Sequence, residues 1–359
     1  MINVAHLTPS FGCGGLERVI ANLISANKNE NIKHIVISLS SNMDFRYALP
    51  DNIEIHTLNK KDGLDLFTHA RFLKLVNKLN IDVLHTYNFA TLEYHFTAKF
   101  SKIKKHIHSD HGLGGDDPSG KNKKHNAFRK FISNLVDDYI VVSDDLKNWL
   151  IETVGIKSDR IEFIFNGVPV YDYIEKQNEN SFCEFVIVGR LAEVKNHKRL
   201  FNSLHDLKNK HNRENFHCYV VGDGPLSGGL KNNVLELNME SYVTFLGHQN
   251  DVKSIIEKSD ALILSSDYEA MPMTALEAMA LSVPVICPRV GGVEDFLSDN
   301  EAILVDGHSV EALTEGLLLF MKMNHEEKSK LSLQAHNLVE SKYSVESMVS
   351  KYNAMYLQL

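Results

Sequence analysis

Residues 261–288 read ALILSSDYEAMPMTALEAMALSVPVICP, and this stretch decides the fold. ALILSS has the continuous apolar character of a buried strand, and VPVICP that of a second one. Between them, DYEAMP has the composition of a loop and MTALEAMA that of a helix. Strand, helix and strand in this order are typical of a parallel sheet covered by helices.

The same alternation runs through the whole chain. Before residue 170 the strand-like runs are INVAHL, HIVISL, IDVLHTY, HIHSDHG, YIVVS and IEFIFNGV. After residue 182 they are EFVIVGR, FHCYVVGDG, YVTFLGH, ALILSS, VPVICP and AILVD. Because 359 residues exceed the usual size of one hydrophobic core, the sequence predicts an α/β protein with two Rossmann-like domains, each a doubly wound parallel sheet.

The domain boundary is expected near residues 168–182, where the chain becomes polar and loses its periodicity. The predicted domains are therefore 1–170 and 183–344. A last helix, at about 345–359, carries apolar residues at helical spacing and needs a surface to cover. We expect this helix to cross back to the first domain.

Composition excludes several classes of protein. The net charge of −8 has its acidic excess in the second half of the chain, which argues against nucleic-acid binding. The four cysteines are scattered, so neither a disulfide framework nor a zinc site is expected. We find no signal-peptide pattern and no run of apolar residues long enough to span a membrane, and the sequence therefore predicts a cytoplasmic protein.

The stretch from residue 261 to 288 contains two glutamates. Glu269 falls in the loop and Glu277 on the following helix, so both are expected at the edge of the sheet where ligands bind. Carboxylates suit sugar hydroxyls, and one carboxylate can hold a ribose diol. The alternative is a glutamate near a helix start and an exposed helix glutamate, but the helix is too apolar for a fully solvated face.

Three strand ends are rich in glycine. Gly12, Gly14 and Gly15 precede a helix start, where free N–H groups attract anions. A nicotinamide cofactor is disfavoured, because Arg18 stands at or near the last glycine position of the dinucleotide fingerprint. The third strand end, at Gly222 and Gly224, suits a close backbone approach to a flat ring.

The second of these ends carries charge. Gly189 is followed by Arg190 and, five residues later, by Lys195, a pair that can clamp a pyrophosphate. The alternative is a solvated helix start with surface cations.

Taken together, these motifs resemble those of family 4 glycosyltransferases, which are retaining enzymes of the GT-B fold. The matching segments, in chain order, are GGLER near the N-terminus, NGV at 166–168, GRLAEVKN at 189–196, VGDGPL at 221–226, YEAMPMTALEAMALSVPVI at 268–286 and VGG at 290–292. The resemblance implies two Rossmann-like domains facing across a cleft. The C-terminal domain would bind a nucleotide sugar and the N-terminal domain an acceptor.

The resemblance also implies roles for individual residues. Arg190 and Lys195 would contact the donor diphosphate, Glu277 the ribose and Glu269 the transferred sugar, while His111 would hydrogen-bond near the sugar and acceptor. The implied catalytic residues are thus His111, Arg190, Lys195 and Glu269. The implied substrate-binding residues are Gly14, Gly15, Asn166, Gly189, Gly222, Met271, Pro272, Met273, Thr274 and Glu277. The chain departs from the family pattern at Ala270 and Asp295, where glycine and glutamate are common.

The implied function is a retaining, hexosyltransferase-type glycosyltransferase. It would move a sugar from a UDP-sugar, or alternatively a GDP-sugar, to a hydroxyl of a glycan or lipid-linked acceptor in bacterial surface-polysaccharide synthesis. No metal or other cofactor is expected, because the basic pair replaces Mg²⁺ at the diphosphate. Two alternatives stay open, a sugar-nucleotide-binding module without turnover and a nucleotide-sugar epimerase of the same fold.

A basic segment suggests a further partner. Residues 99–130 contain nine lysines and arginines against three aspartates. Each cation near an anionic leaflet contributes about 1 kcal/mol to membrane binding, which favours peripheral attachment at the inner face of the plasma membrane. The alternative is a solvated loop and helix face.

Overall fold

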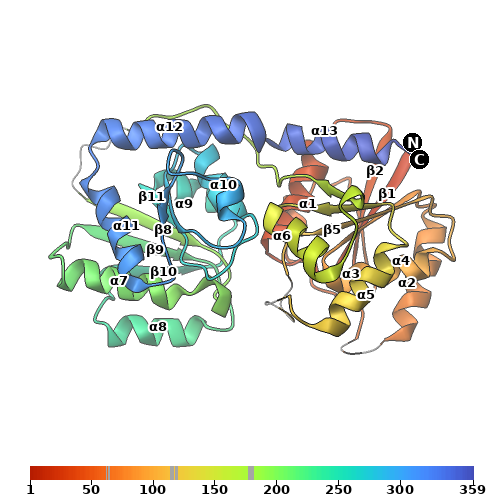
Figure 1. The fold of residues 1–359 in the computed structure, drawn as a ribbon, viewed down its shortest axis with the longest axis horizontal. Helices are drawn as coiled ribbons and strands as arrows, with labels where there is room; N and C mark the ends of the chain where they lie inside the picture. Colours follow the sequence, from red (N-terminus) through yellow and green to blue (C-terminus); the bar gives the residue numbers. More distant parts are fainter. Residues whose placement is uncertain (62, 64, 114–116, 118–119, 177–181) are drawn as a thin grey trace. The chain divides into compact units, whose positions relative to one another are not determined.

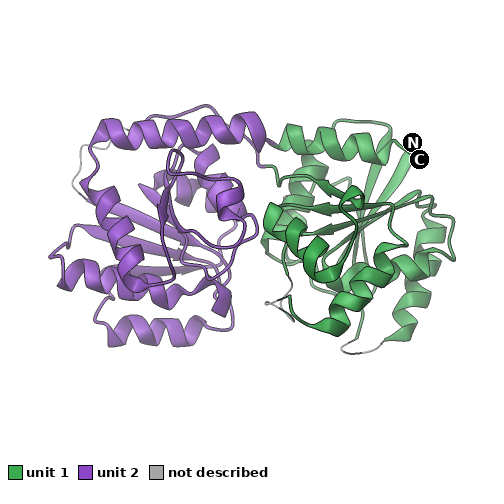
Figure 2. Cartoon of the chain, in the orientation of Figure 1, with its two compact units in different colours: residues 1–167, 345–359 green, residues 168–344 purple. Residues whose placement is uncertain are grey.

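The chain forms two compact units in the computed structural model, which describes residues 1–61, 63, 65–113, 117, 120–176 and 182–359. Unit 1 comprises Met1–Gly167 and Val345–Leu359, and unit 2 comprises Val168–Ser344 (Figure 2). The last helix is therefore part of unit 1. Parts of the predicted linker (177–181) and of the basic segment (114–116 and 118–119) lie outside the described residues.

Unit 1 is built on a sheet of seven parallel strands in the order β3-β2-β1-β4-β5-β6-β7. The strands are β1 (Ile2–Thr8), β2 (Ile32–Ser38), β3 (Glu54–Thr57), β4 (Val83–Tyr87), β5 (Lys105–Asp110), β6 (Asp138–Val141) and β7 (Ile161–Phe163). The α-helices are α1 (Gly15–Ala26), α2 (Leu66–Lys78), α3 (Phe89–Leu92), α4 (Tyr94–Ala98), α5 (Lys123–Ser133), α6 (Asp144–Trp149) and α13 (Val345–Tyr356) (Figure 1).

Unit 2 repeats this plan with six parallel strands in the order β10-β9-β8-β11-β12-β13. The strands are β8 (Cys183–Val188), β9 (Phe216–Val221), β10 (Val243–Gly247), β11 (Ala261–Ile263), β12 (Val285–Pro288) and β13 (Ile303–Val305). The α-helices are α7 (His197–Asn209), α8 (Ser227–Glu236), α9 (Val252–Lys258), α10 (Met273–Ala280), α11 (Val310–Lys322) and α12 (His325–Lys342).

The chain reverses direction across each sheet. In unit 2 it moves outward from β8 to β10 and returns to place β11 on the other side of β8. Accordingly α7, α8 and α11 lie on one face of the sheet, and α9, α10 and α12 on the other (Figure 1). The predicted α/β fold of two doubly wound parallel sheets is confirmed. Ligands bind such sheets at the carboxyl ends of the strands where the order reverses.

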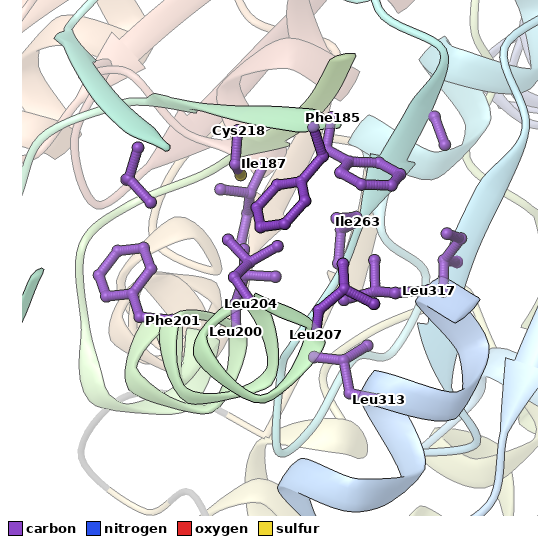
Figure 3. Packing of buried hydrophobic residues seen from close by; sticks show 14 of the residues in the cluster. Phe185, Ile187, Leu200, Phe201, Leu204, Leu207, Cys218, Ile263, Leu313 and Leu317 are labelled. Carbon is purple, nitrogen blue, oxygen red and sulfur yellow. The ribbon is translucent and has the colours of Figure 1, made fainter. Parts of the chain in front are cut away.

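The core of unit 2 is apolar. Leu200, Leu204 and Leu207 follow a helical spacing along α7 and are completely buried against the sheet (Figure 3). The alternate residues Phe185 and Ile187 of β8 meet them from the sheet. This packing fixes the start of α7, and with it the loop that follows β8.

Several histidine side chains are buried in the core of unit 1. His6 on β1 hydrogen-bonds the Tyr87 hydroxyl at 2.8 Å and His34 at 2.8 Å, and all three side chains are buried. His85 hydrogen-bonds the hydroxyl of Tyr356 at 2.7 Å, which ties α13 to the sheet. These bonds satisfy polar groups that would otherwise be costly to bury.

The sequence raised three structural questions, about disulfides, metal sites and membrane-spanning helices. Cys183, Cys218 and Cys287 are buried and Cys13 is exposed, and none of the four is in a disulfide. In the part of the chain that the structure describes, no group of histidine, cysteine and carboxylate side chains is arranged to hold a metal ion. No described helix combines the length and apolarity that a membrane span requires.

The buried histidines predict an acid-sensitive unit 1. Burial lowers the pKa of His34 and His106 to about 4, and that of His6, His85 and His95 well below the usual value. The unfolded chain therefore binds protons below about pH 6.5 that the folded unit does not, and stability falls by about 1.4 kcal/mol per pH unit for each such histidine. Calorimetry between pH 8 and pH 5 should show a falling melting temperature below about pH 6.5.

Hydrogen exchange can show which of the two units is destabilised as the pH falls. Protection should be lost first in β1, β2 and β4, because His197 and His336 are the only described histidines of unit 2 whose pKa is clearly lowered. A melting temperature that is constant over this range, or earlier loss of protection in β8 and β11, would contradict the prediction.

Candidate functional site

The reversal of strand order in unit 2 brings two loops together. β8 and β11 are neighbours, with Phe185 opposite Ala261 and Val186 opposite Leu262. The loop after β8 therefore emerges beside the loop after β11 at the carboxyl edge of the sheet. The first loop carries Arg190 and Lys195, and the second carries Glu269.

A salt bridge joins these loops. Nζ of Lys195 donates a hydrogen bond to Oε1 of Glu269 at 2.6 Å, and the side chains are 27% and 10% exposed. The Ser266 hydroxyl donates to the same oxygen at 2.6 Å. Ser265 donates to the backbone carbonyl of Lys195 at 2.8 Å. A cation and a carboxylate are thus held at the edge of the sheet, each still partly accessible.

A buried arginine holds the same loops from behind. Arg199 on α7 donates to the carbonyl oxygens of Ser265 at 2.9 Å and Ser266 at 3.2 Å, and it forms a salt bridge with Asp267. Asn196 caps α7 through its side chain and donates to Asp267 at 3.1 Å. The backbone N–H of Asp267 donates to the Val194 carbonyl at 2.8 Å, which completes the link between the two loops.

Two glycines allow the close packing of these turns. Gly222 has φ +128°, and a Cβ placed on it would lie 2.0 Å from the Gly189 carbonyl oxygen. Gly291 has φ +54°, and a Cβ there would lie 2.3 Å from the Glu269 carbonyl oxygen. Both positions combine a left-handed backbone with direct backbone contact, so only glycine fits. The turns after β8, β9 and β11 are therefore fixed in place.

The predicted substrate-binding residues 271–274 form the start of α10. Met271, Pro272 and Met273 are buried, and Thr274 is partly exposed. Pro272 stands at the N-cap and offers no side-chain hydrogen bond, so the helix start keeps backbone N–H groups for a ligand. Glu277 lies one turn after Thr274 and is also partly exposed, so these two side chains share the open face of the helix.

Arg190, the other cation of the predicted pair, is more exposed to solvent than Lys195. Arg190 follows Gly189 directly and is exposed, and no ion pair links its guanidinium to a described residue. The side chain of Lys195 runs beside Gly189, whose added Cβ would meet Lys195 Cε at 3.7 Å. Unit 2 thus brings Gly189, Lys195, Gly222 and Glu269 into one contact network.

In unit 1 the predicted residues His111 and Asn166 come together. His111 follows β5, and its backbone N–H donates to Asn88 Oδ1 at 2.9 Å. Burial lowers the pKa of the His111 side chain to about 4, while the nearby side chains of Asp110 and Asn166 act in the opposite direction. His106 and His108 instead lie within β5 and bond to His95 and Thr86, which makes them part of the core.

The glycine turn before α1 holds a carboxylate. A Cβ on Gly14 would lie 2.5 Å from Glu17 Oε2, and Ser10 donates to the other oxygen of Glu17 at 3.3 Å. Burial raises the pKa of Glu17. Gly15 begins the helix, and Gly14 at the N-cap leaves its N–H groups without a side-chain cap. The acidic side chain beside Gly14 makes this turn a poorer site for an anion than the sequence suggested.

Sequence reasoning missed several of these residues. Ser266 bonds to Glu269, and its signal was available in the polar pair that ends the strand ALILSS. Arg199 and Asp267 had no signal, because an arginine on a polar helix normally indicates a solvated face.

Two cations of the basic segment are also unavailable to a membrane. Lys105 pairs with Asp138 at 3.0 Å and Arg129 with Asp110 at 2.5 Å, and both cations are buried.

Family models match both units. The model described as Glycosyltransferase Family 4 matches residues 13–171, and the model described as Glycosyl transferases group 1 matches residues 173–337. Together they span most of the chain, and each covers most of one unit.

Individual proteins are similar over the full length. An Escherichia coli UDP-Gal:alpha-D-GlcNAc-diphosphoundecaprenol alpha-1,3-galactosyltransferase is 23% identical, over 100% of this chain and 97% of its own. A Campylobacter jejuni N-acetylgalactosamine-N,N'-diacetylbacillosaminyl-diphospho-undecaprenol 4-alpha-N-acetylgalactosaminyltransferase is 24% identical, over 86% and 87%. The Anabaena protein HepE, solved with UDP-glucose, superposes with a TM-score of 0.83 at 15% identity over 100% of both chains.

The parallel-sheet units, the charged edge of unit 2 and the two family models agree with one another. The chain belongs to the group 1, family 4 glycosyltransferases of the GT-B fold.

Proposed function

We propose that this glycosyltransferase transfers a hexose from a UDP-sugar, with retention of anomeric configuration, to a hydroxyl of a glycan or lipid-linked acceptor in bacterial surface-polysaccharide synthesis. The observation that carries the proposal is the contact between Lys195 and Glu269 at the reversal of strand order in unit 2. A cation for the diphosphate and a carboxylate for the sugar stand side by side there, as donor binding requires.

The cations are proposed to act on the leaving group. Breaking the bond between the anomeric carbon and the phosphate oxygen leaves negative charge on the diphosphate. Lys195 is already oriented by Glu269, and the exposed guanidinium of Arg190 is available for bidentate contact with phosphate oxygens. Because these side chains offset the charge, the proposed reaction needs no metal ion or other cofactor.

Glu269 is proposed to position the sugar and not to attack it. Its Oε1 accepts bonds from both Lys195 and Ser266, and a carboxylate held in this way is a weaker nucleophile. Both of these donors bond to Oε1, so Oε2 can accept a hydrogen bond from a sugar hydroxyl. In this mechanism the acceptor attacks on the face that the diphosphate leaves, and a phosphate oxygen takes the proton. A sugar trapped covalently on Glu269 would overturn it.

The remaining substrate contacts follow from position. On unit 2, Glu277 is proposed to hold the ribose hydroxyls, and the N–H groups at the start of α10 to contact the phosphates or the sugar. On unit 1, His111 after β5 and Asn166 after β7 are proposed to contribute to acceptor binding, because their side chains interact. Gly14 and Gly15 contribute a backbone surface without side chains.

The relatives support the choice of donor and acceptor. The name of the E. coli relative specifies a UDP-sugar donor and an acceptor linked to diphosphoundecaprenol, and that of the C. jejuni relative also specifies a diphospho-undecaprenol acceptor. HepE was solved with UDP-glucose. A UDP-sugar is therefore favoured over a GDP-sugar, and a lipid-linked acceptor over a soluble one. Such an acceptor places the protein at a membrane surface, on the cytoplasmic side where nucleotide sugars are present.

The Lys195→Met variant tests the role of the cation. We expect kcat for UDP release to fall by about a hundred- to a thousandfold, because one preorganised charge contact in a transition state is worth roughly 3 to 4 kcal/mol. Lys198→Met is the matched control, since Lys198 lies close by in the first turn of α7 and is exposed. Equal losses in the two variants, with unchanged melting temperatures, would count against the proposal.

A panel of nucleotide sugars tests the donor. At a hundred times its dissociation constant a ligand stabilises the folded state by about 2.7 kcal/mol, so the correct donor should raise the melting temperature of the protein. We expect a UDP-sugar to give the largest shift, with EDTA having no effect, and UDP to be released once an acceptor is added. A shift without release would favour a binding module, and a shift with GDP-sugars alone would correct the donor. The proton NMR spectrum of the product gives its anomeric configuration.

A further inference from the structure

Arg199 contacts the loop after β11, although its side chain comes from α7. Its Nη1 donates to the carbonyl oxygens of Ser265 at 2.9 Å and Ser266 at 3.2 Å, and its Nη2 forms a salt bridge with Asp267. A single planar guanidinium thus holds three consecutive residues of one loop. Arg199, Ser265 and Ser266 are all buried, so water competes little for the two carbonyl groups.

The backbone of α7 gives Arg199 a fixed origin. Leu200 and Leu204, which follow it on the same helix, pack against the sheet of unit 2 (Figure 3). Ser203 lies one turn after Arg199, and its hydroxyl is 3.0 Å from the carbonyl oxygen of Val310 at the start of α11. The helix is therefore anchored both to the sheet and to a neighbouring helix. From this position Arg199 can determine where the loop after β11 lies.

Ser266 connects Arg199 to the candidate sugar-binding carboxylate. Its carbonyl oxygen accepts the bond from Arg199, and its hydroxyl donates to Glu269 Oε1 at 2.6 Å. The same oxygen of Glu269 accepts a hydrogen bond from Lys195 Nζ at 2.6 Å. A shift of the Ser266 backbone would therefore move the hydroxyl that orients Glu269.

Helix α10 is held in a different way. Its buried side chains include Met273, Leu276 and Met279, and the helix packs against α12. The N–H groups at the start of α10 and the side chain of Glu277 are the proposed contacts of the nucleoside diphosphate. Loss of the Arg199 side chain should therefore disturb Glu269 more than it disturbs these contacts.

We propose that Arg199 is a positioning residue, which acts through Ser266 to hold Glu269 where the sugar of the donor binds. The inference rests on the proposed function, in which Glu269 positions that sugar. It goes further because it assigns the two parts of the donor to different supports within unit 2. Arg199 supports the contact with the sugar, and the packing of α10 supports the contacts with the nucleoside diphosphate.

The Arg199→Leu variant of the full chain tests the proposal. We expect kcat for UDP release to fall by about ten- to a hundredfold, because a misplacement of about 1 Å can reduce a rate by a hundredfold. The dissociation constant for UDP, measured by calorimetry, should change by less than about twofold, since Arg199 does not support the diphosphate contacts. The dissociation constant for UDP-glucose or UDP-galactose, divided by that for UDP, should rise by about fivefold, as expected for one lost hydrogen bond.

Arg71→Leu is the matched control. Arg71 on α2 also bonds to two consecutive carbonyl groups and one carboxylate, because it donates to Leu58 at 2.8 Å and Asn59 at 3.3 Å and pairs with Asp65 at 2.9 Å. These residues belong to unit 1, and none of them is proposed to contact a substrate. Both variants should lower the melting temperature, since each leaves backbone oxygens without their donor. Only Arg199→Leu should lower kcat.

A double-mutant cycle tests the connection through Ser266. Ser266→Ala removes the hydroxyl that bonds to Glu269 but keeps the carbonyl group that accepts from Arg199. If Arg199 acts through Ser266, the double variant should lose much less activity than the product of the two single losses.

Two milder variants serve if Arg199→Leu does not fold. Arg199→Lys keeps the charge but not the planar fork, so its kcat should lie between those of Arg199→Leu and the unchanged chain. Asp267→Asn removes the salt bridge at a side chain that is 47% exposed, and it should lower kcat without weakening UDP binding.

The results separate this inference from the proposed function. The inference is overturned if Arg199→Leu keeps the kcat of the unchanged chain, if it weakens UDP binding as much as it lowers kcat, or if the losses in the cycle multiply. An equal fall of kcat in Arg71→Leu would also overturn it, because it would indicate a general loss of stability. Absence of UDP release from the unchanged chain with every acceptor would refute the proposed transfer. The ratio of dissociation constants needs no turnover and would still decide the role of Arg199.

Discussion

The candidate site depends on the adjacency of β8 and β11. These strands are far apart in the sequence, yet they pair directly because the chain reverses across the sheet after β10. Each intervening strand would separate the two loops by about 4.8 Å, more than a salt bridge tolerates. With the observed order, Lys195 reaches Glu269 at 2.6 Å. The topology of the sheet, and not local sequence, creates the charged pair.

Local contacts then make this geometry rigid. Arg199 satisfies the carbonyl groups of Ser265 and Ser266 in a position that water does not reach easily, and losing such partners typically costs about 1 to 3 kcal/mol per buried group. Asn196 adopts a left-handed conformation, with φ 44°, that asparagine tolerates better than most residues. In that conformation its side chain both caps α7 and bonds to Asp267. One residue thus fixes the helix start and the opposite loop.

Much of the fold, and part of the candidate site, could be predicted from the sequence. Alternating apolar runs gave the two sheets, and glycines after the strands located the turns, because only glycine permits contacts such as that of Gly222 with Gly189. The contact between Lys195 and Glu269 was foreseen only as shared proximity to a donor. The salt bridge between Arg199 and Asp267 could not be foreseen, since the burial of a helix arginine depends on tertiary packing. For the same reason Lys105 and Arg129 were expected to be surface cations, although both are buried and paired with carboxylates.

The two units offer different chemistry at their strand ends. In unit 2 a lysine and an arginine accompany the loop after β8, which suits a diphosphate. In unit 1 His111 lies beside the buried Asp110, which favours the protonated ring, but burial is the larger effect and keeps the pKa of His111 at about 4. At neutral pH the ring is therefore uncharged, with one nitrogen able to donate and the other to accept a hydrogen bond. A neutral imidazole next to Asn166 is better matched to sugar hydroxyls than to phosphate. The charge on each unit thus agrees with anionic donor binding by unit 2 and hydroxyl recognition by unit 1.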